Sequence, residues 1–208
     1  MLMSERNTRH RVHPSVPTKL LEPLWGKQTN IWTTADAPKS HLEDKKLNFQ
    51  WTLWYHEVDD HRWTKESYQK IYTFTNWAEF WAFYDQMPTW LNGMFFLMRD
   101  GIFPQWEDEQ NIRGGYWSYK IPKVIGDEAW VQLSSHVIGE CATKKLTDMY
   151  YVNGIAISPK INNCIIKILN RDAKHADNDR LTSEIPYLPT ETVAFKAHLE
   201  NREEFVYD

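Results

Sequence analysis

From residue 48 onwards, the hydrophobic pattern is dominated by short segments with the two-residue period of β-strands. In NFQWTLWYH (48–56) the residues Phe49, Trp51, Leu53 and Tyr55 fall on one face. The same reasoning predicts further strands at 68–74, 93–101, 116–121, 149–158, 164–170 and 192–198, separated by turn-rich segments.

Two segments have the period of a helix instead. Asn76 is a favourable N-cap, and Glu79 follows at capping-box spacing. The helix that they start is predicted to end before Pro88, and its apolar face consists of Trp77, Phe80, Trp81 and Tyr84. A second helix is predicted from an Asp127 cap to Ile138, with Gly139 as its stop.

Strands outnumber helices and follow one another at hairpin spacing. The expected fold class is therefore α+β, with a single antiparallel sheet of about eight strands covered by about three helices. Residues 1–45 are rich in proline and polar residues and lack sustained periodicity, so we expect a flexible N-terminal extension followed by one domain at 46–208.

Composition narrows the class of protein. The 208 residues are 42% hydrophobic and 25% charged, as in ordinary globular proteins. No apolar run reaches the ~18 residues of a membrane-spanning helix. Cys141 and Cys164 cannot form a disulfide framework, which favours a reducing compartment, the cytoplasm or the nucleus.

Charge is unevenly distributed along the chain. The formal net charge is −4, yet residues 141–175 hold six lysines and arginines, among them Lys160 and Lys167, against two aspartates. A local basic patch on an acidic body suits a small anionic ligand better than a long nucleic-acid duplex. A solvated surface is the alternative explanation for these charges.

Aromatic residues point to a flat ligand. The chain has 11 tryptophans, and Trp106 lies in an acidic, turn-rich loop immediately before Glu107. An indole face beside a carboxylate matches a guanine edge, whose N1–H and amino group one carboxylate can accept together. Trp63 lies in another predicted loop and could complete a sandwich around one base. For both tryptophans, packing against the protein body is the alternative.

Other chemistry has weaker support. HEVDDH (56–61) has the composition of a metal site but not the His-Glu-x-x-His spacing. Cys141 and His136 lack an evident third partner for nucleophilic catalysis, and no Gly-rich phosphate loop is present. We therefore predict no catalytic residue, no metal and no cofactor.

These residues resemble the translation initiation factor 4E family of mRNA cap-binding proteins. The resemblance covers about residues 48–200, and its strongest blocks are WTLWY (51–55), FWAFY (80–84), DGIFPQWEDEQNIRGGYW (100–117) and VIGE (137–140). It implies a cupped sheet with its helices on the convex side, and a 7-methylguanine ring sandwiched between Trp63 and Trp106 and hydrogen-bonded to Glu107.

The resemblance also implies roles for residues around the cap. Lys160 aligns with a phosphate-contacting arginine, and Lys167 is the nearest candidate for a second phosphate contact. The tryptophan that touches the methyl group in many members aligns with Leu169, and a basic residue of the family aligns with Tyr116. Divergent protist members show changes of this sort.

On the convex face, the resemblance implies a groove for an amphipathic helix of a 4G-type scaffold or a 4E-binding regulatory protein. The aligned positions are Trp77, Trp81, Val131 and Ser135. We expect a monomeric, non-enzymatic protein that binds the capped 5′ end of mRNA and recruits the scaffold, with no membrane association. The alternatives are a cap-binding-impaired paralogue that regulates translation through protein contacts, and an enzyme acting on capped ends.

Overall fold

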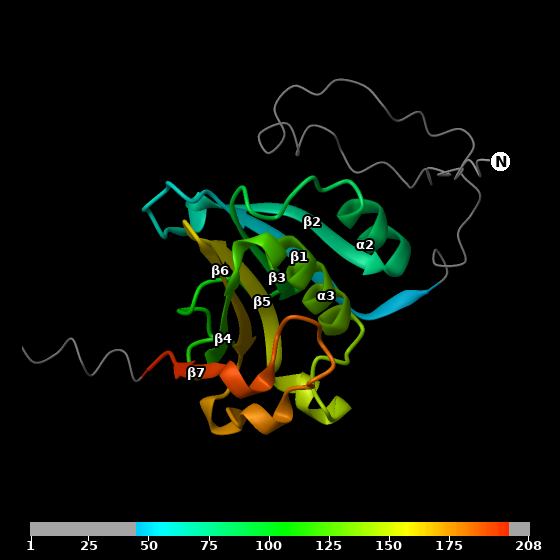
Figure 1. The fold of residues 1–208 in the computed structure, drawn as a ribbon, viewed down its shortest axis with the longest axis vertical. Helices are drawn as coiled ribbons and strands as arrows, with labels where there is room; N and C mark the ends of the chain where they lie inside the picture. The colour runs from blue at the N-terminus through cyan, green and yellow to red at the C-terminus, as the bar shows by residue number, and fades with distance from the viewer. Residues whose placement is uncertain (1–44, 200–208) are drawn as a thin grey trace, which may run out of the picture.

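The computed structural model describes residues 45–199, and the predicted extension at 1–45 lies outside them except for Lys45. Figure 1 shows one curved sheet with two α-helices packed on one of its faces. No helix in the described part of the chain is long and apolar enough to cross a bilayer.

The sheet is antiparallel throughout, with strand order β2-β1-β3-β5-β6-β4-β7. This confirms the predicted α+β class, with seven described strands where about eight were expected. The strands are β1 (Lys46–His56), β2 (Tyr68–Asn76), β3 (Met94–Arg99), β4 (Gly115–Pro122), β5 (Val152–Pro159), β6 (Asn163–Asn170) and β7 (Ala194–Ala197).

Two α-helices are present in the described residues, α2 (Trp77–Tyr84) and α3 (Gly126–Ile138). Short 3-10 helices connect other elements: η2 (Lys65–Ser67), η3 (Lys123–Ile125), η4 (Leu146–Tyr151), η5 (Ala173–His175), η6 (Asn178–Arg180) and η7 (Thr190–Thr192).

The start of α2 follows the predicted cap. The Asn76 side chain accepts a hydrogen bond from the Glu79 backbone N–H at 2.9 Å. The Glu79 carboxylate reaches one residue further than a standard capping box and accepts from the Thr75 N–H and hydroxyl. Four orphan donors of a helix start need such acceptors, so the local sequence is sufficient to fix this boundary.

The predicted cap of α3 is wrong. Ile125 occupies the N-cap position and makes no side-chain cap, and Asp127 lies inside the first turn. The Asp127 carboxylate instead accepts from the Trp90 N–H at 2.6 Å and from the Thr89 hydroxyl. The Asp127 carboxylate is therefore used in a tertiary contact with residues 89 and 90 and not as a local helix cap.

The core lies between the sheet and the helices and is unusually aromatic. Four tryptophans are at most 2% exposed: Trp51, Trp90, Trp117 and Trp130. In β1, Trp51 and Leu53 are buried as predicted, but Thr52 and His56 on the other face are buried too, and Phe49 is 52% exposed. Its ring packs against the Arg99 guanidinium, 4.2 Å from ring centroid to Cζ.

Arg99 forms a buried ion pair across the core margin. Its Nη2 lies 3.1 Å from Glu140 Oε2, and both side chains are less than a tenth exposed. Arg99 also donates to the carbonyls of Val152 and Met149. Burial lowers the pKa of Arg99, and the charge of Glu140 opposes that shift. The carboxylate is therefore what makes the buried cation tolerable.

We predict that Glu140→Gln destabilises the fold by about 3 kcal/mol, because it leaves the buried Arg99 cation without its counter-charge. Urea unfolding followed by far-UV circular dichroism measures this. The matched control is Glu184→Gln, the same chemical change at an exposed side chain, which should change stability by less than about 0.5 kcal/mol. Equal stability of the two variants would contradict a stabilising role for the pair.

Candidate ligand-binding pocket

A cavity of about 610 Å³ opens on the face of the sheet opposite the core and its helices. Its strand residues alternate with buried core residues, so they point away from the core. The strands contribute Tyr68, Phe96, Tyr116, Ala156, Lys167 and Leu169, and the connecting segments contribute Trp63, Pro104, Gln105, Trp106, Glu107, Asn111 and His198.

Strand register sets the floor of the pocket. Phe96 pairs with Ala156, which pairs with Lys167, so these residues form one cross-strand row. In a second row Leu169 pairs with Tyr116, and Tyr116 pairs with Lys196. Directly paired residues share a face of the sheet. The floor is therefore apolar toward β3 and β5 and becomes basic toward β6 and β7.

Trp63 stands at one wall, in the β1–β2 connection. Its ring is stacked on His56, with ring centroids 4.3 Å apart and planes 11° from parallel. His56 is fully buried, whereas Trp63 remains 54% exposed. One face of the indole is thus already covered, and much of the rest is available to a ligand.

His56 also holds the ends of that loop. Its Nδ1 lies 2.8 Å from the Glu57 carbonyl and its Nε2 3.2 Å from the Arg62 carbonyl. A neutral imidazole donates from one nitrogen and an imidazolium from both. Within the loop, Asp60 accepts from the Arg62 backbone N–H and guanidinium, an ion pair that keeps the pKa of Asp60 low.

Trp106 and Glu107 come from the β3–β4 connection. Asn111 braces this loop from inside by donating to the carbonyls of Phe103 and Gln105. The Gln105 amide in turn donates to the Trp63 carbonyl. The two loops that carry the tryptophans are therefore joined directly.

Glu107 is exposed at the pocket mouth, and its charge reaches the buried wall. Burial raises the pKa of Tyr68, and the negative charge of Glu107 raises it further. Tyr68 therefore stays a neutral phenol, and Glu107 lines the pocket, where a carboxylate can accept hydrogen bonds from a ligand.

Three lysines converge at the other end. The Lys167 ammonium lies over the Tyr116 ring, 4.0 Å from its centroid. Burial lowers the pKa of Lys167, and the charges of Lys160 and Lys196 lower it further. Neighbouring cations without a counter-charge make a ready site for an anion.

His198 completes this end of the pocket. Its ring centroid is 6.3 Å from that of Trp106 and 5.7 Å from that of Tyr116. Burial and the charge of Lys167 lower its pKa to about 4. At neutral pH the ring is therefore uncharged and contributes a flat surface rather than a further cation.

The structure brings together most of the ligand-contacting residues predicted from sequence. Trp63, Trp106, Glu107, Lys167 and Leu169 all line the pocket. Lys160 lies outside the pocket wall, in the β5–β6 turn, where its charge still reaches Lys167. The roles of these residues in binding stay predictions.

Among the residues that sequence reasoning missed, Tyr68 and His198 line the pocket and Lys196 lies beside it. Lys196 and His198 sit two residues apart in AFKAH, a spacing that places both on one face of a strand. That signal was present in the sequence. The pairing of β4 with β7, however, could not be predicted from this segment alone. It places Lys196 opposite Tyr116, which is 80 residues earlier in the chain.

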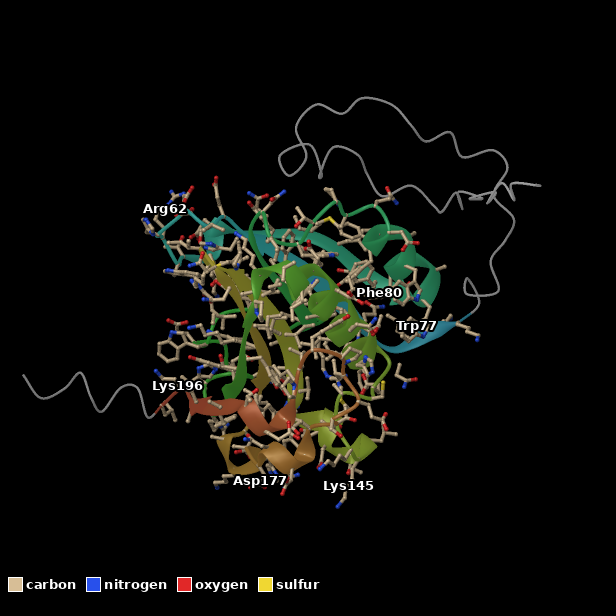
Figure 2. The ribbon with its side chains drawn as sticks, in the orientation of Figure 1. Arg62, Trp77, Phe80, Lys145, Asp177 and Lys196 are labelled. Carbon is tan, nitrogen blue, oxygen red and sulfur yellow. The ribbon has the colours of Figure 1, made fainter. Side chains whose placement is uncertain are left out.

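On the opposite face, both α2 and α3 cover the sheet (Figure 1). Trp77, Trp81 and Val131 are partly buried against the core, and Ser135 is half-buried on α3. Figure 2 shows Trp77 and Phe80 on the side of the molecule away from Arg62 and Lys196. The two tryptophans are thus neither wholly core nor free on the surface.

The weaker motifs acquire structural explanations. In residues 45–199, no three His, Cys, Asp or Glu side chains are arranged to hold a metal ion. The Cys141 thiol donates to the His136 carbonyl, and His136 Nδ1 lies on the Gln132 carbonyl. Burial raises the pKa of Cys141, as do nearby carboxylates, so this thiol is not activated as a nucleophile.

Comparisons with known proteins agree on one family. The family model described as eukaryotic initiation factor 4E matches residues 46–205. Eukaryotic translation initiation factor 4E of Eremothecium gossypii is 29% identical over 164 residues, covering 73% of this chain and 76% of that protein. The Saccharomyces cerevisiae protein of the same name is 31% identical over 147 residues, covering 64% and 68%.

Solved structures have the same fold. Caenorhabditis elegans eIF4E-3, in complex with the 4E-binding protein Mextli and a cap analog, superimposes with a TM-score of 0.67 at 23% identity, covering 76% of this chain and 95% of that one. Ascaris suum eIF4E-3 with the m7G cap gives 0.63 at 22% identity, covering 74% and 91%.

The His56–Trp63 stack yields a prediction about loop order. His56→Ala removes the ring and both contacts to loop carbonyls, which should lower the free energy of loop opening by about 2 kcal/mol. Amide hydrogen exchange at residues 57–64, read by mass spectrometry, should then accelerate roughly thirtyfold.

Two control variants test whether the effect comes from the stacked ring of His56 or from its hydrogen bonds. His56→Phe keeps an aromatic ring under Trp63 and should show a smaller acceleration than His56→Ala. His61→Ala alters an exposed histidine of the same loop and should leave exchange unchanged. Identical exchange in wild type and His56→Ala would show that the loop does not depend on this ring.

Proposed function

The chain belongs to the eukaryotic initiation factor 4E family, and we propose that it binds the 7-methylguanosine cap of mRNA between Trp63 and Trp106. The single observation that carries the proposal is the pocket itself. Two tryptophans from separate, directly joined loops stand at one cavity with a carboxylate beside them and lysines at its far end.

The base would be recognised by stacking and by two hydrogen bonds. Methylation at N7 makes the guanine ring cationic, so a sandwich between indoles adds cation–π attraction to ordinary stacking, which contributes about 1–3 kcal/mol per base. The Glu107 carboxylate can accept from N1–H and from the N2 amino group. The covered rear face of Trp63 supports this arrangement, because the indole is held in place before the ligand arrives.

The phosphates would lie at the basic end. Lys167 is the cation in the pocket wall, and Lys160 and Lys196 contribute charge from neighbouring elements. Lys196 pairs across from Tyr116, the position where the family resemblance implies a basic residue. A cation on β7 thus compensates for its loss on β4. Leu169, next to Tyr116 in register, would give the methyl group an apolar contact.

The helix-covered face would recruit a partner. Trp77 and Trp81 on α2 and Val131 on α3 leave partly exposed apolar surface on the two helices, and an amphipathic helix can bind surface of this kind. We assign this surface to a 4G-type scaffold or a 4E-binding regulatory protein. The protein would act in translation initiation by joining the capped end to that partner, by binding rather than by catalysis.

A regulator with impaired cap binding is the second candidate. Leu169 and Tyr116, in place of larger or basic family residues, favour it, whereas the three converging lysines favour cap binding. Titration of tryptophan fluorescence with 7-methyl-GTP and with GTP separates the two. Strong quenching by the methylated ligand supports cap binding, and equal or absent quenching supports the regulator.

We predict that Glu107→Gln weakens binding of 7-methyl-GTP by at least about tenfold, or ~1.5 kcal/mol, because charge-assisted hydrogen bonds to the base are lost. The fluorescence titration measures the change. Glu109→Gln, the same change at an exposed position in the same loop, is the control and should bind as wild type. Unaltered affinity in Glu107→Gln would refute the assignment of this carboxylate.

We also predict that Trp81→Ala weakens binding of a helical 4G-type peptide by about 2 kcal/mol, roughly thirtyfold, because Trp81 is a partly exposed aromatic anchor on α2. Calorimetric titration measures peptide affinity, and 7-methyl-GTP affinity should not change. Trp63→Ala should give the reverse pattern. Loss of both affinities in one variant, with its thermal unfolding unchanged, would contradict two separate sites.

A further inference from the structure

A basic strip continues from the pocket along the open face of the sheet. It consists of Lys167 and Lys120, with Lys160 at the β5–β6 turn and Lys196 on β7. Ser118 pairs with Lys167 and Lys120 with Ile165, which makes Lys120 the diagonal neighbour of Lys167 on the same face. Lys120 does not line the pocket. The charge therefore extends about 7 Å beyond the pocket along β4.

The strip is free of acidic residues. Residues 115–122, 158–170 and 194–198 contain these four lysines and neither aspartate nor glutamate, although the chain as a whole carries a charge of −4. Among the described residues, none of the four takes part in an ion pair. Clustered cations without counter-charges attract an extended anion.

The opposite end of the pocket has the opposite charge. Residues 57–67, between β1 and β2, hold four acidic side chains against Arg62 and Lys65, and residues 107–109 are Glu, Asp and Glu. A polyanion that leaves the pocket is therefore repelled from the base end and drawn along the strip. At the β5–β6 turn it meets Ile161, which is 91% exposed and offers an apolar contact.

From this arrangement we infer that the strip binds the RNA that follows the cap, with Lys120 contacting a backbone phosphate downstream of the triphosphate. The inference rests on the proposed cap-binding function, because the bound cap fixes the position of the first RNA nucleotides. Continuity with the pocket favours RNA over an acidic peptide, because the first downstream nucleotides are covalently attached to a ligand seated beside Lys167.

The test compares 7-methyl-GTP with a capped RNA of about six nucleotides, titrated by fluorescence over a series of salt concentrations. Wild type should bind the capped RNA more tightly and with a steeper salt dependence, because further phosphates are neutralised. Lys120→Gln should weaken capped-RNA binding about fivefold and reduce its salt slope by about 0.7. It should leave 7-methyl-GTP affinity unchanged.

Two variants serve as controls. Lys145→Gln removes an exposed lysine that does not line the pocket and that lies at the lower edge of the molecule in Figure 2. This variant should bind both ligands as wild type. Lys120→Arg keeps the charge and should retain capped-RNA affinity. The comparison of Lys120→Gln with Lys120→Arg distinguishes loss of a phosphate contact from damage to β4.

Three outcomes would overturn the inference. Capped RNA that binds no more tightly than 7-methyl-GTP would mean that the strip is not used. Equal losses of capped-RNA affinity in Lys120→Gln and Lys145→Gln would mean that the RNA responds to the overall charge of the protein and not to a contact with Lys120. A polyglutamate peptide that competes with the RNA and loses the same affinity in Lys120→Gln would mean an acidic-protein surface. Wild type that does not prefer 7-methyl-GTP to GTP would instead refute the proposed function itself.

Discussion

The geometry of the pocket depends on a close approach of three backbones at Gly114 and Gly115. A Cβ at Gly114 would lie 1.7 Å from the Asn170 carbonyl oxygen, and one at Gly115 would lie 2.3 Å from that of Lys196. No side chain fits either position, so glycine lets β4 enter between β6 and β7. That insertion puts Tyr116 between Leu169 and Lys196, and it ends the loop that carries Trp106 and Glu107.

Buried polar groups then hold that loop to the sheet. Asn153 on β5 donates to the Gln110 carbonyl and to the Asn111 side chain, and accepts from Arg171 at the end of β6. Such a network is costly if broken and rigid when satisfied. Because Gln105 also binds the Trp63 carbonyl, both aromatic walls are fixed relative to the floor. A flat ligand would meet a preformed slot, with little ordering entropy lost on binding.

Local patterns in the sequence were sufficient for the strands, for the start of α2 and for the two loop tryptophans as candidates. They were insufficient where a distant partner decides. Asp127 has the sequence context of an N-cap, but its carboxylate accepts a hydrogen bond from the Trp90 N–H instead. Phe49 has the period of a core residue, but it is exposed and packs on the outer side of the buried Arg99 guanidinium. Lys196 and His198 belong to the site through the β4–β7 register. That pairing is not encoded by any spacing within AFKAH.

The same pairing brings the charge of Lys196 near Lys167. Burial of Lys167 and the charges of the two further lysines disfavour its charged form. The cation–π contact with Tyr116 offsets part of that cost without neutralising the charge. An anion bound in the pocket would supply the missing counter-charge for these lysines. Departures from local consistency of this kind are expected where function constrains the chain.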